Sequence, residues 1–320
     1  MTIKPIAMRD ALLECIWQAM STNDKIFFTS ADFGSPVLDK IRSDFASRFV
    51  NVGVAEQNLI NVSAGLALEG YTVFAYAIAP FITMRCYEQT RVNLALLSEV
   101  RPMNVNLIGV GAGYSYVVSG PTHQCYEDIT LMRAMPNFRV LSPSDHITSA
   151  ALMDTCMRHM GPKYLRLDAQ VLTPLYENAQ QAVAQGFHVH KRGEDVCIVA
   201  TGYMMHTALQ VAEKFKQKNI HIGVIDLIDL YGFNDVQLLK ELCRYKKIIS
   251  LEEGFKGRGG MDALIFNLLS EEIGSPQLVN LGVEGAYRFE LGTRSELHEL
   301  VGIGPKVVES RVSDILKESH

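Results

Sequence analysis

The stretch from Phe49 to Gly70, FVNVGVAEQNLINVSAGLALEG, joins a strand pattern directly to a helix pattern. Residues 49–54 are apolar and rich in β-branched side chains, which predicts a short buried strand. Small and apolar residues at helical spacing follow, and Gly70 is placed to act as the C-cap of that helix. Glu56 lies where the strand passes into the helix. On this local pattern Glu56 is either a carboxylate that favours the N-terminal helix dipole or a functional acid.

The same alternation of strand and helix patterns runs through most of the chain. Further strands are expected at 26–29, 72–77, 105–110, 139–141, 163–167, 196–200, 222–226, 247–251 and 276–282. Further helices are expected at 7–20, 81–97, 125–135, 147–157, 204–217, 236–244 and 261–270. Apolar strands that alternate with helices predict an α/β fold with doubly wound, mostly parallel sheets.

The pattern breaks once, between Ala169 and Gly193, where Pro174 precedes a piece rich in Asn, Gln and Ala. We therefore expect one domain over residues 1–178, a linker over 179–193 and a second, smaller doubly wound domain over 194–320. A chain of 320 residues is long enough for two domains of ordinary size.

Charge and cysteine usage limit the partners and the compartment. The net charge of -5 disfavours nucleic acid or an anionic membrane surface as the main partner. The six cysteines are scattered without CxxC pairs, which is typical of reduced thiols in a cytoplasmic protein. The opening residues, MTIKPIAMRD, contain no apolar export signal. The uncharged run 71–84 is too short to cross a membrane, and 104–122 is too polar.

Several short motifs occur in a fixed order. They are VGVAEQN (52–58), APF (79–81), GPTHQ (120–124), LMR (131–133), PN (136–137) and SPSD (142–145). Together they resemble the transketolase and deoxyxylulose phosphate synthase family, from near Pro5 to the C-terminus. The match covers only the second half of a full-length transketolase. The resemblance implies a pyrimidine-binding domain followed by a transketolase C-terminal domain.

The resemblance also implies thiamine diphosphate as the cofactor, with Glu56 as a catalytic residue. Glu56 would hydrogen-bond N1′ of the aminopyrimidine and help the cofactor to form its reactive carbanion. Phe81, Met84 and Tyr87 match the pocket around the pyrimidine, although Met84 replaces an aromatic residue. Phe81 and Tyr87 also fit apolar positions on a buried helix. Asp32, in the loop after the first strand, is expected beside the cofactor.

Substrate contacts are implied for a second group of residues. His123, in the GPTH loop, resembles the histidine that bonds the substrate oxygens as the new bond forms, which makes it the second catalytic candidate. Arg9 and Arg166 match arginines that reach a sugar phosphate in transketolases, and Ser35 is expected beside them. An arginine near a strand end is otherwise most often part of a surface ion pair.

Two departures from the family pattern fall on the acceptor side. Ser119 stands where the family has an acidic residue that reads an acceptor hydroxyl, and the loop 111–113 (Gly-Ala-Gly) replaces a basic residue. A branched, bulky or non-phosphorylated acceptor therefore fits as well as a simple aldose phosphate.

The diphosphate half of the family's cofactor site is missing. That half is a Gly-Asp-Gly with a later Asn, which holds a divalent metal, and no Gly-Asp-Gly occurs in this sequence. The Gly-rich stretch 257–260 is weak evidence for phosphate binding and also fits a tight turn before a helix. No metal ligand is therefore assigned here, and a separate N-terminal transketolase-like subunit should bring the Gly-Asp-Gly and Mg²⁺. We expect a heterotetramer with two copies of each chain.

These features predict the C-terminal subunit of a split transketolase-like enzyme that moves a two-carbon ketol unit from a ketose donor to an aldehyde acceptor. Three alternatives stay open. They are the beta subunit of a 2-oxo acid dehydrogenase, a deoxyxylulose phosphate synthase-like enzyme, and a non-catalytic regulatory subunit of the same fold. The GPTHQ loop and the MRAMPN run favour transketolase, and the presence of both Glu56 and His123 disfavours a non-catalytic role.

Overall fold

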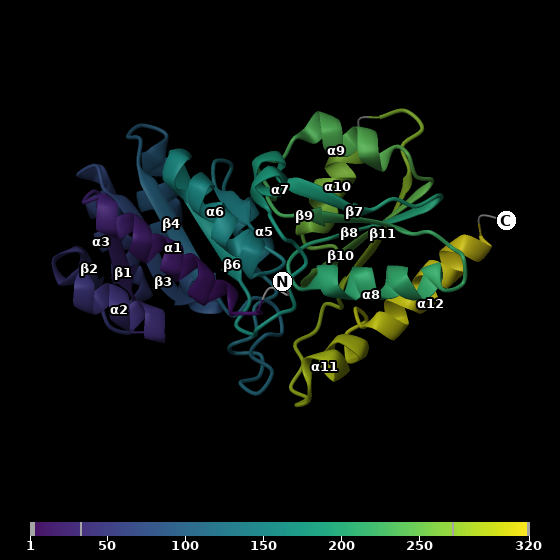
Figure 1. Cartoon of the computed structure of the whole chain (residues 1–320), viewed down its shortest axis with the longest axis horizontal. Helices are drawn as coiled ribbons and strands as arrows, with labels where there is room; N and C mark the ends of the chain where they lie inside the picture. Colours follow the sequence, from purple (N-terminus) through teal and green to yellow (C-terminus); the bar gives the residue numbers. More distant parts are fainter. Residues whose placement is uncertain (1–3, 33, 271, 319–320) are drawn as a thin grey trace.

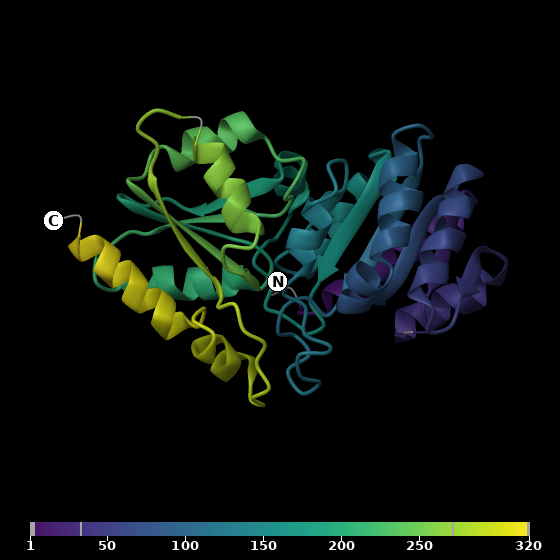
Figure 2. The same cartoon turned by 180° about the vertical axis from the view of Figure 1, so that it is seen from behind.

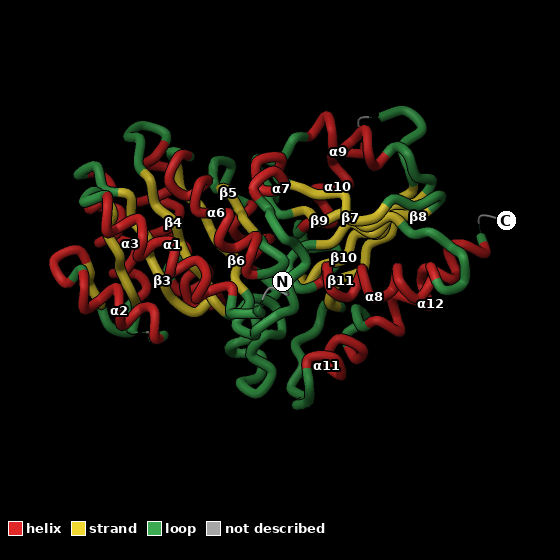
Figure 3. Tube along the Cα trace, viewed as in Figure 1, coloured by secondary structure: helices red, strands yellow, loops and turns green. Residues whose placement is uncertain are grey.

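A computed structural model describes residues 4–32, 34–270 and 272–318. Two α/β halves lie side by side, the first purple to teal and the second green to yellow (Figure 1). In each half, strands form a layer between helices (Figure 3). Phe33, in the loop expected after the first strand, lies outside the described residues. None of the described helices is both long and apolar enough to cross a membrane.

Six parallel strands form the first sheet, in the order β2-β1-β3-β4-β6-β5. They are β1 (Ile26–Ser30), β2 (Phe49–Asn51), β3 (Thr72–Ile78), β4 (Asn104–Val110), β5 (Arg139–Leu141) and β6 (Gly161–Leu167). Along β3, Val73 and Ala75 join one core cluster, whereas Phe74 and Tyr76 join another. This alternation is what a strand buried on both faces requires.

Helices cover both faces of this sheet. One face carries α1 (Met8–Thr22), α2 (Pro36–Asp44), α6 (His146–Arg158) and α7 (Gln180–Gln185). The other carries α3 (Glu56–Leu68), α5 (Asp128–Arg133) and a helical run made of η2 (Phe81–Arg85), α4 (Tyr87–Gln89) and η3 (Thr90–Leu96). Figure 2 views the chain from behind and so brings the blue helices of this second face to the front.

Five strands form the second sheet, in the order β11-β10-β8-β9-β7, with β7 antiparallel to β9. They are β7 (Phe187–Lys191), β8 (Val196–Ala200), β9 (Gly223–Leu227), β10 (Lys247–Phe255) and β11 (Gln277–Val283). One face packs on α8 (Met204–Lys216), α11 (Arg294–Leu300) and α12 (Pro305–Lys317). The other packs on α9 (Asp235–Leu242) and α10 (Met261–Ser270). The expected fold class, two doubly wound and mostly parallel sheets, is confirmed.

Two local expectations were wrong. The strand expected over 49–54 ends at Asn51 and is not buried, because it forms the edge of the sheet and pairs only with β1. The segment 179–193 is not a plain connection, because α7 packs beside α6 and β7 joins the second sheet. Gly186, at a φ of 79°, ends α7 and turns the chain into β7. The Gln- and Ala-rich composition of the segment 179–193 did not indicate that it contains a short helix.

Candidate active site

Glu56 is the first residue of α3, and its side chain is enclosed, with 2% of its surface exposed. The Nη1 of Arg85 donates a hydrogen bond to Glu56 Oε2 at 2.7 Å. An open hollow of about 420 Å³ lies beside this pair, lined also by Val54, Gln57 and Asn61. A buried carboxylate thus lines an open recess, which is the arrangement expected for an acid that meets a ligand.

The helical run after β3 places the residues that face Glu56. Its first segment, η2, has π-type hydrogen bonding, a rare form that is frequently found at functional sites in proteins. Within it the Thr83 hydroxyl donates to the carbonyl of Ala79 at 2.7 Å, which helps to hold this non-standard turn. Phe81 and Arg85 lie one turn apart, and the guanidinium carbon of Arg85 sits 4.3 Å from the Phe81 ring centroid.

His123 completes a chain of contacts that begins at Glu56. Its ring meets that of Phe81 edge-on, with centroids 5.2 Å apart. Its Nδ1 shares a 2.9 Å hydrogen bond with the Thr122 hydroxyl, which fixes the ring orientation. The two predicted catalytic residues are therefore linked through Arg85 and Phe81, although they lie 67 positions apart in the sequence.

The other residues predicted to bind the cofactor differ in exposure and in hydrogen bonding. Met84 is 36% exposed, and Tyr87 is half-buried, with its hydroxyl donating to the carbonyl of Leu131 at 3.1 Å. The packing interpretation therefore accounts for Tyr87 without a ligand. Asp32 is exposed, has a φ of 47° and accepts a hydrogen bond from Asn51 Nδ2.

The residues predicted to contact substrate differ in how many contacts their side chains already make within the chain. Ser35 is the N-cap of α2 and accepts a hydrogen bond from the amide of Leu38 at 3.2 Å, a local role that its hydroxyl can fill without a ligand. Arg9 pairs with Asp10 at 2.8 Å and lies near the buried Tyr76. Ser119 is exposed in the turn before the GPTH loop.

Arg166 occupies an environment that the sequence pattern does not indicate. Its side chain is 1% exposed, and its Nε donates to Asp128 Oδ2 at 2.8 Å. Its Nη2 donates to the carbonyl of Glu253 at 3.0 Å, so the guanidinium joins the two halves of the chain. Burial alone would lower the pKa of Arg166, but the Asp128 carboxylate raises it. A substrate phosphate would have to compete with these buried partners.

The loop that replaces the family's basic residue is filled from within the chain. Gly111 has a φ of 106°, and a Cβ there would collide with the Tyr116 ring. Burial raises the pKa of Tyr116 to about 12, so its hydroxyl is neutral under ordinary conditions. A neutral aromatic side chain thus lies where the resemblance expects a cation.

A buried ionic cluster joins the carboxyl end of β6 to the second sheet. Arg294 pairs with Asp168 at 2.6 Å and with Glu253 at 2.7 Å, and all three side chains are at most 4% exposed. Burial alone would raise the pKa of Glu253, but Arg294 and His298 hold it well below its usual range. Both carboxylates of this cluster are paired with the buried Arg294, which indicates a structural role.

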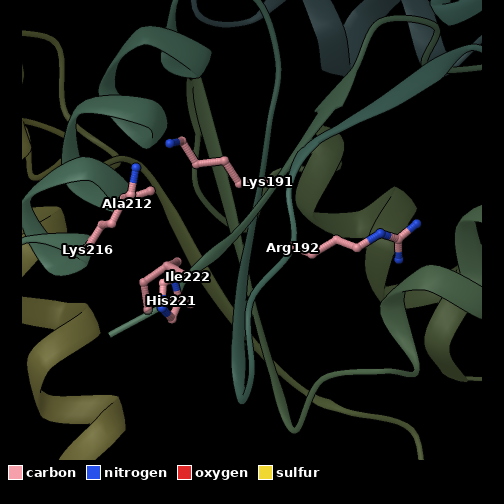
Figure 4. Close-up of a pocket in the computed structure, with 6 residues that line it drawn as sticks. All are labelled: Lys191, Arg192, Ala212, Lys216, His221 and Ile222. Carbon is pink, nitrogen blue, oxygen red and sulfur yellow. The ribbon is translucent and has the colours of Figure 1, made fainter. Parts of the chain in front are cut away.

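A small cavity of about 190 Å³ lies in the second half, away from these residues (Figure 4). Lys191 and Arg192 line it, but Figure 4 shows their side chains pointing in different directions. Each also pairs with a carboxylate, Lys191 with Glu213 and Arg192 with Glu241. The cavity therefore does not form a convergent anion site. Among the described residues, no three His, Cys, Asp or Glu side chains gather as metal ligands.

Comparison with known proteins agrees with this geometry. The family description "Transketolase, pyrimidine binding domain" matches residues 4–174, and "Transketolase, C-terminal domain" matches residues 186–308. The chain belongs to the transketolase family. The resemblance stated from the motifs is thereby confirmed.

Individual relatives match over most of their length. A subunit of the apulose-4-phosphate transketolase of Actinobacillus succinogenes is 29% identical over 81% of this chain and 82% of its own length. A 6-deoxy-6-sulfo-D-fructose transketolase subunit of a Clostridium species is 25% identical over 98% and 95%. The solved structure of a split-gene transketolase, an inactive β4 tetramer, superposes with a TM-score of 0.86 at 29% identity, covering 98% of this chain and 99% of that one. This chain is therefore a transketolase-like subunit of the split type.

Sequence reasoning gave no role to Arg85, although it lies between the two catalytic candidates. The available signal was its spacing: Arg85 follows Phe81 by four residues in a predicted helix, so the two share a face. Its contact with Glu56, 29 residues earlier, is a product of the fold.

Proposed function

We propose that this chain supplies the pyrimidine half of a thiamine diphosphate site in a split transketolase that transfers a two-carbon ketol unit from a ketose to an aldehyde. The observation that carries the proposal is the enclosed Glu56 carboxylate, joined to His123 through Arg85 and Phe81 beside an open hollow. The second catalytic candidate is thus within reach of the first, as one reaction centre requires.

The residues present fit an aminopyrimidine. Glu56 offers a carboxylate edge, and Phe81 offers the face of an aromatic ring against which a flat heterocycle can stack. When bound, the cofactor supplies the carbanion chemistry of its thiazolium ring. Glu56 would hold and exchange a proton at N1′ of the pyrimidine. His123 would donate a hydrogen bond to a substrate oxygen as negative charge develops there.

The remaining half of the site would come from a partner. The chain contains no Gly-Asp-Gly, so the diphosphate and Mg²⁺ would be held by an N-terminal transketolase-like subunit. The β4 split-gene neighbour, which is inactive, supports this division of labour. Two copies of each chain would form the active heterotetramer. The six free cysteines suit a reducing compartment such as the cytoplasm.

The isolated chain is expected to bind thiamine diphosphate only weakly, even with Mg²⁺, because it lacks ligands for the diphosphate. Mixed with the N-terminal subunit, it should bind the cofactor at micromolar concentration or tighter and elute as a heterotetramer. Calorimetry on each chain and on the mixture, with light scattering for the assembly, measures both. Micromolar binding to this chain alone would contradict the split site.

The same mixture, assayed with a panel of ketose donors and aldehyde acceptors, tests the reaction. Formation of a ketose two carbons longer than the acceptor is the expected result. Oxidation of a 2-oxo acid without ketose formation would instead identify a 2-oxo acid dehydrogenase subunit.

Ser119→Asp is expected to sharpen the preference for 2-hydroxyaldehydes over aldehydes that lack the hydroxyl. Ser119 is exposed and carries no charge, so the unmodified pocket should distinguish the two weakly. A site that hydrogen-bonds a hydroxyl rejects an analogue without it by factors of roughly 10⁴, whereas a neutral pocket does not. The ratio of kcat/KM for the two aldehydes measures the effect.

Val118→Asp is the matched control, because Val118 is the adjacent residue and is 83% exposed. It adds the same charge one position away and should leave the ratio unchanged. An unmodified enzyme that already prefers 2-hydroxyaldehydes by more than about a thousandfold would refute the inference from Ser119.

A further inference from the structure

Arg85 makes two contacts that use the flat shape of its guanidinium. One edge donates to the carboxylate of Glu56 at 2.7 Å, and the group lies over the Phe81 ring with its carbon 4.3 Å from the centroid. The side chain of Arg85 is 44% exposed, whereas that of Glu56 is 2% exposed. Arg85 is therefore the exposed partner of a buried carboxylate.

These are the same two contacts that the proposed function requires of an aminopyrimidine. Both groups are flat, stack on aromatic rings and hydrogen-bond a carboxyl group: the guanidinium donates to the carboxylate, whereas N1′ of the pyrimidine shares a proton with it. A guanidinium that bonds Glu56 and covers Phe81 occupies the space in which the heterocycle would make those bonds. The two groups would compete for the same carboxylate oxygen and the same ring.

We propose that Arg85 is a gate on the cofactor site, which occupies the pyrimidine position in the free subunit and turns away when the cofactor arrives. This inference rests on the proposed function. In the free chain the gate gives the buried Glu56 an opposite charge. In the loaded site the aminopyrimidine takes over the hydrogen bond to the carboxylate.

The surroundings allow the movement. The hollow of about 420 Å³ beside Glu56 is lined by Arg85 itself and by the polar side chains of Gln57, Asn58 and Asn61. A released guanidinium can turn into this recess and keep its hydrogen bonds with amide oxygens or water. The guanidinium side of the pair is 44% exposed, and a cofactor that bonds Glu56 in its place leaves the buried carboxyl group with a partner.

The principal test is calorimetry of thiamine diphosphate with Mg²⁺ on the complex with the N-terminal subunit. Arg85→Met should tighten the cofactor Kd by about tenfold, because no competitor then has to leave, a change equal to about 1.4 kcal/mol. Arg85→Lys can still pair with Glu56 but cannot stack as a plane, so its Kd should lie between those of the other two. Arg85→Lys also provides the test of the gate if Arg85→Met folds poorly.

Arg91→Met is the matched control. Arg91 is an exposed arginine on η3 of the same helical run, and its loss removes the same charge. Its Kd should equal that of the unmodified complex. An unchanged Kd in Arg85→Met would refute the gate, and a weaker one would show that Arg85 holds the cofactor.

A second readout needs no cofactor. In the isolated chain labelled with ¹⁵N, the side-chain Nε–H signal of Arg85, assigned by its loss in Arg85→Met, should shift in Glu56→Gln. The same signal should shift when thiamine diphosphate is added to the complex. An Arg85 Nε–H signal with the same chemical shift in Glu56→Gln as in the unmodified chain would refute the gate. The signal could shift in Glu56→Gln while no variant of the complex binds the cofactor. That result would refute both the proposed function and the gate, and it would support only the ion pair between Glu56 and Arg85.

Discussion

Glu56→Gln is expected to lower kcat of the assembled enzyme by on the order of a hundredfold or more, the usual size of a general acid–base contribution. Gln keeps the shape and can still form a hydrogen bond, but it cannot exchange a proton with the pyrimidine. The fold and most of the cofactor affinity should persist. Deuterium exchange at the thiazolium carbon of bound cofactor measures the affected step directly.

Glu88→Gln is the matched control for this experiment. Glu88 is exposed on α4, three residues beyond Arg85, and loses the same charge without touching the hollow. Its kcat and exchange rate should be unchanged. If Glu56→Gln exchanges deuterium as fast as the unmodified complex, Glu56 is only a helix-start carboxylate, and the proposed mechanism is wrong.

Arg166→Met is expected to destabilise the isolated chain by about 3–5 kcal/mol, because it leaves the buried Asp128 carboxylate without its cation. The pair is enclosed, with both side chains at most 1% exposed. Chemical denaturation followed by circular dichroism gives the free energy of unfolding, with the midpoint as the main observable.

Arg158→Met provides the comparison. Arg158 pairs with Asp154 at 2.7 Å, but its side chain is 80% exposed, so its loss should cost no more than about 1 kcal/mol. Equal stability of Arg166→Met and the unmodified chain, together with a raised KM for phosphorylated sugars only, would restore Arg166 as a phosphate ligand.

Arg166 also marks what a sequence pattern can and cannot predict. Its position near the end of a strand was predictable, because apolar periodicity located 163–167 within two residues of β6. Its partner was not, since Asp128 lies 38 residues earlier, on a different element. Pairing between side chains depends on how elements pack, and local periodicity carries no information about that.

Glu56 and His123 were easier to place, because each lies in a motif whose order along the chain is itself informative. The helix after Glu56 was also clear from its small residues and from Gly70, which has a φ of 85°. The edge position of β2 was harder to foresee. A short apolar strand looks the same at the edge of a sheet as in its centre, and only the pairing order separates the two cases.

The cluster around Arg294 has a consequence for how such an enzyme could open. Asp168 belongs to the first half of the chain, Glu253 and Arg294 to the second, and Arg294 pairs with both carboxylates out of contact with water. Swinging the halves apart would strand these charges, at a cost of several kcal/mol. The two halves of the chain should therefore move together as one rigid body. Admission of a cofactor would then require movement at the boundary with the proposed partner subunit, together with the turn proposed for Arg85.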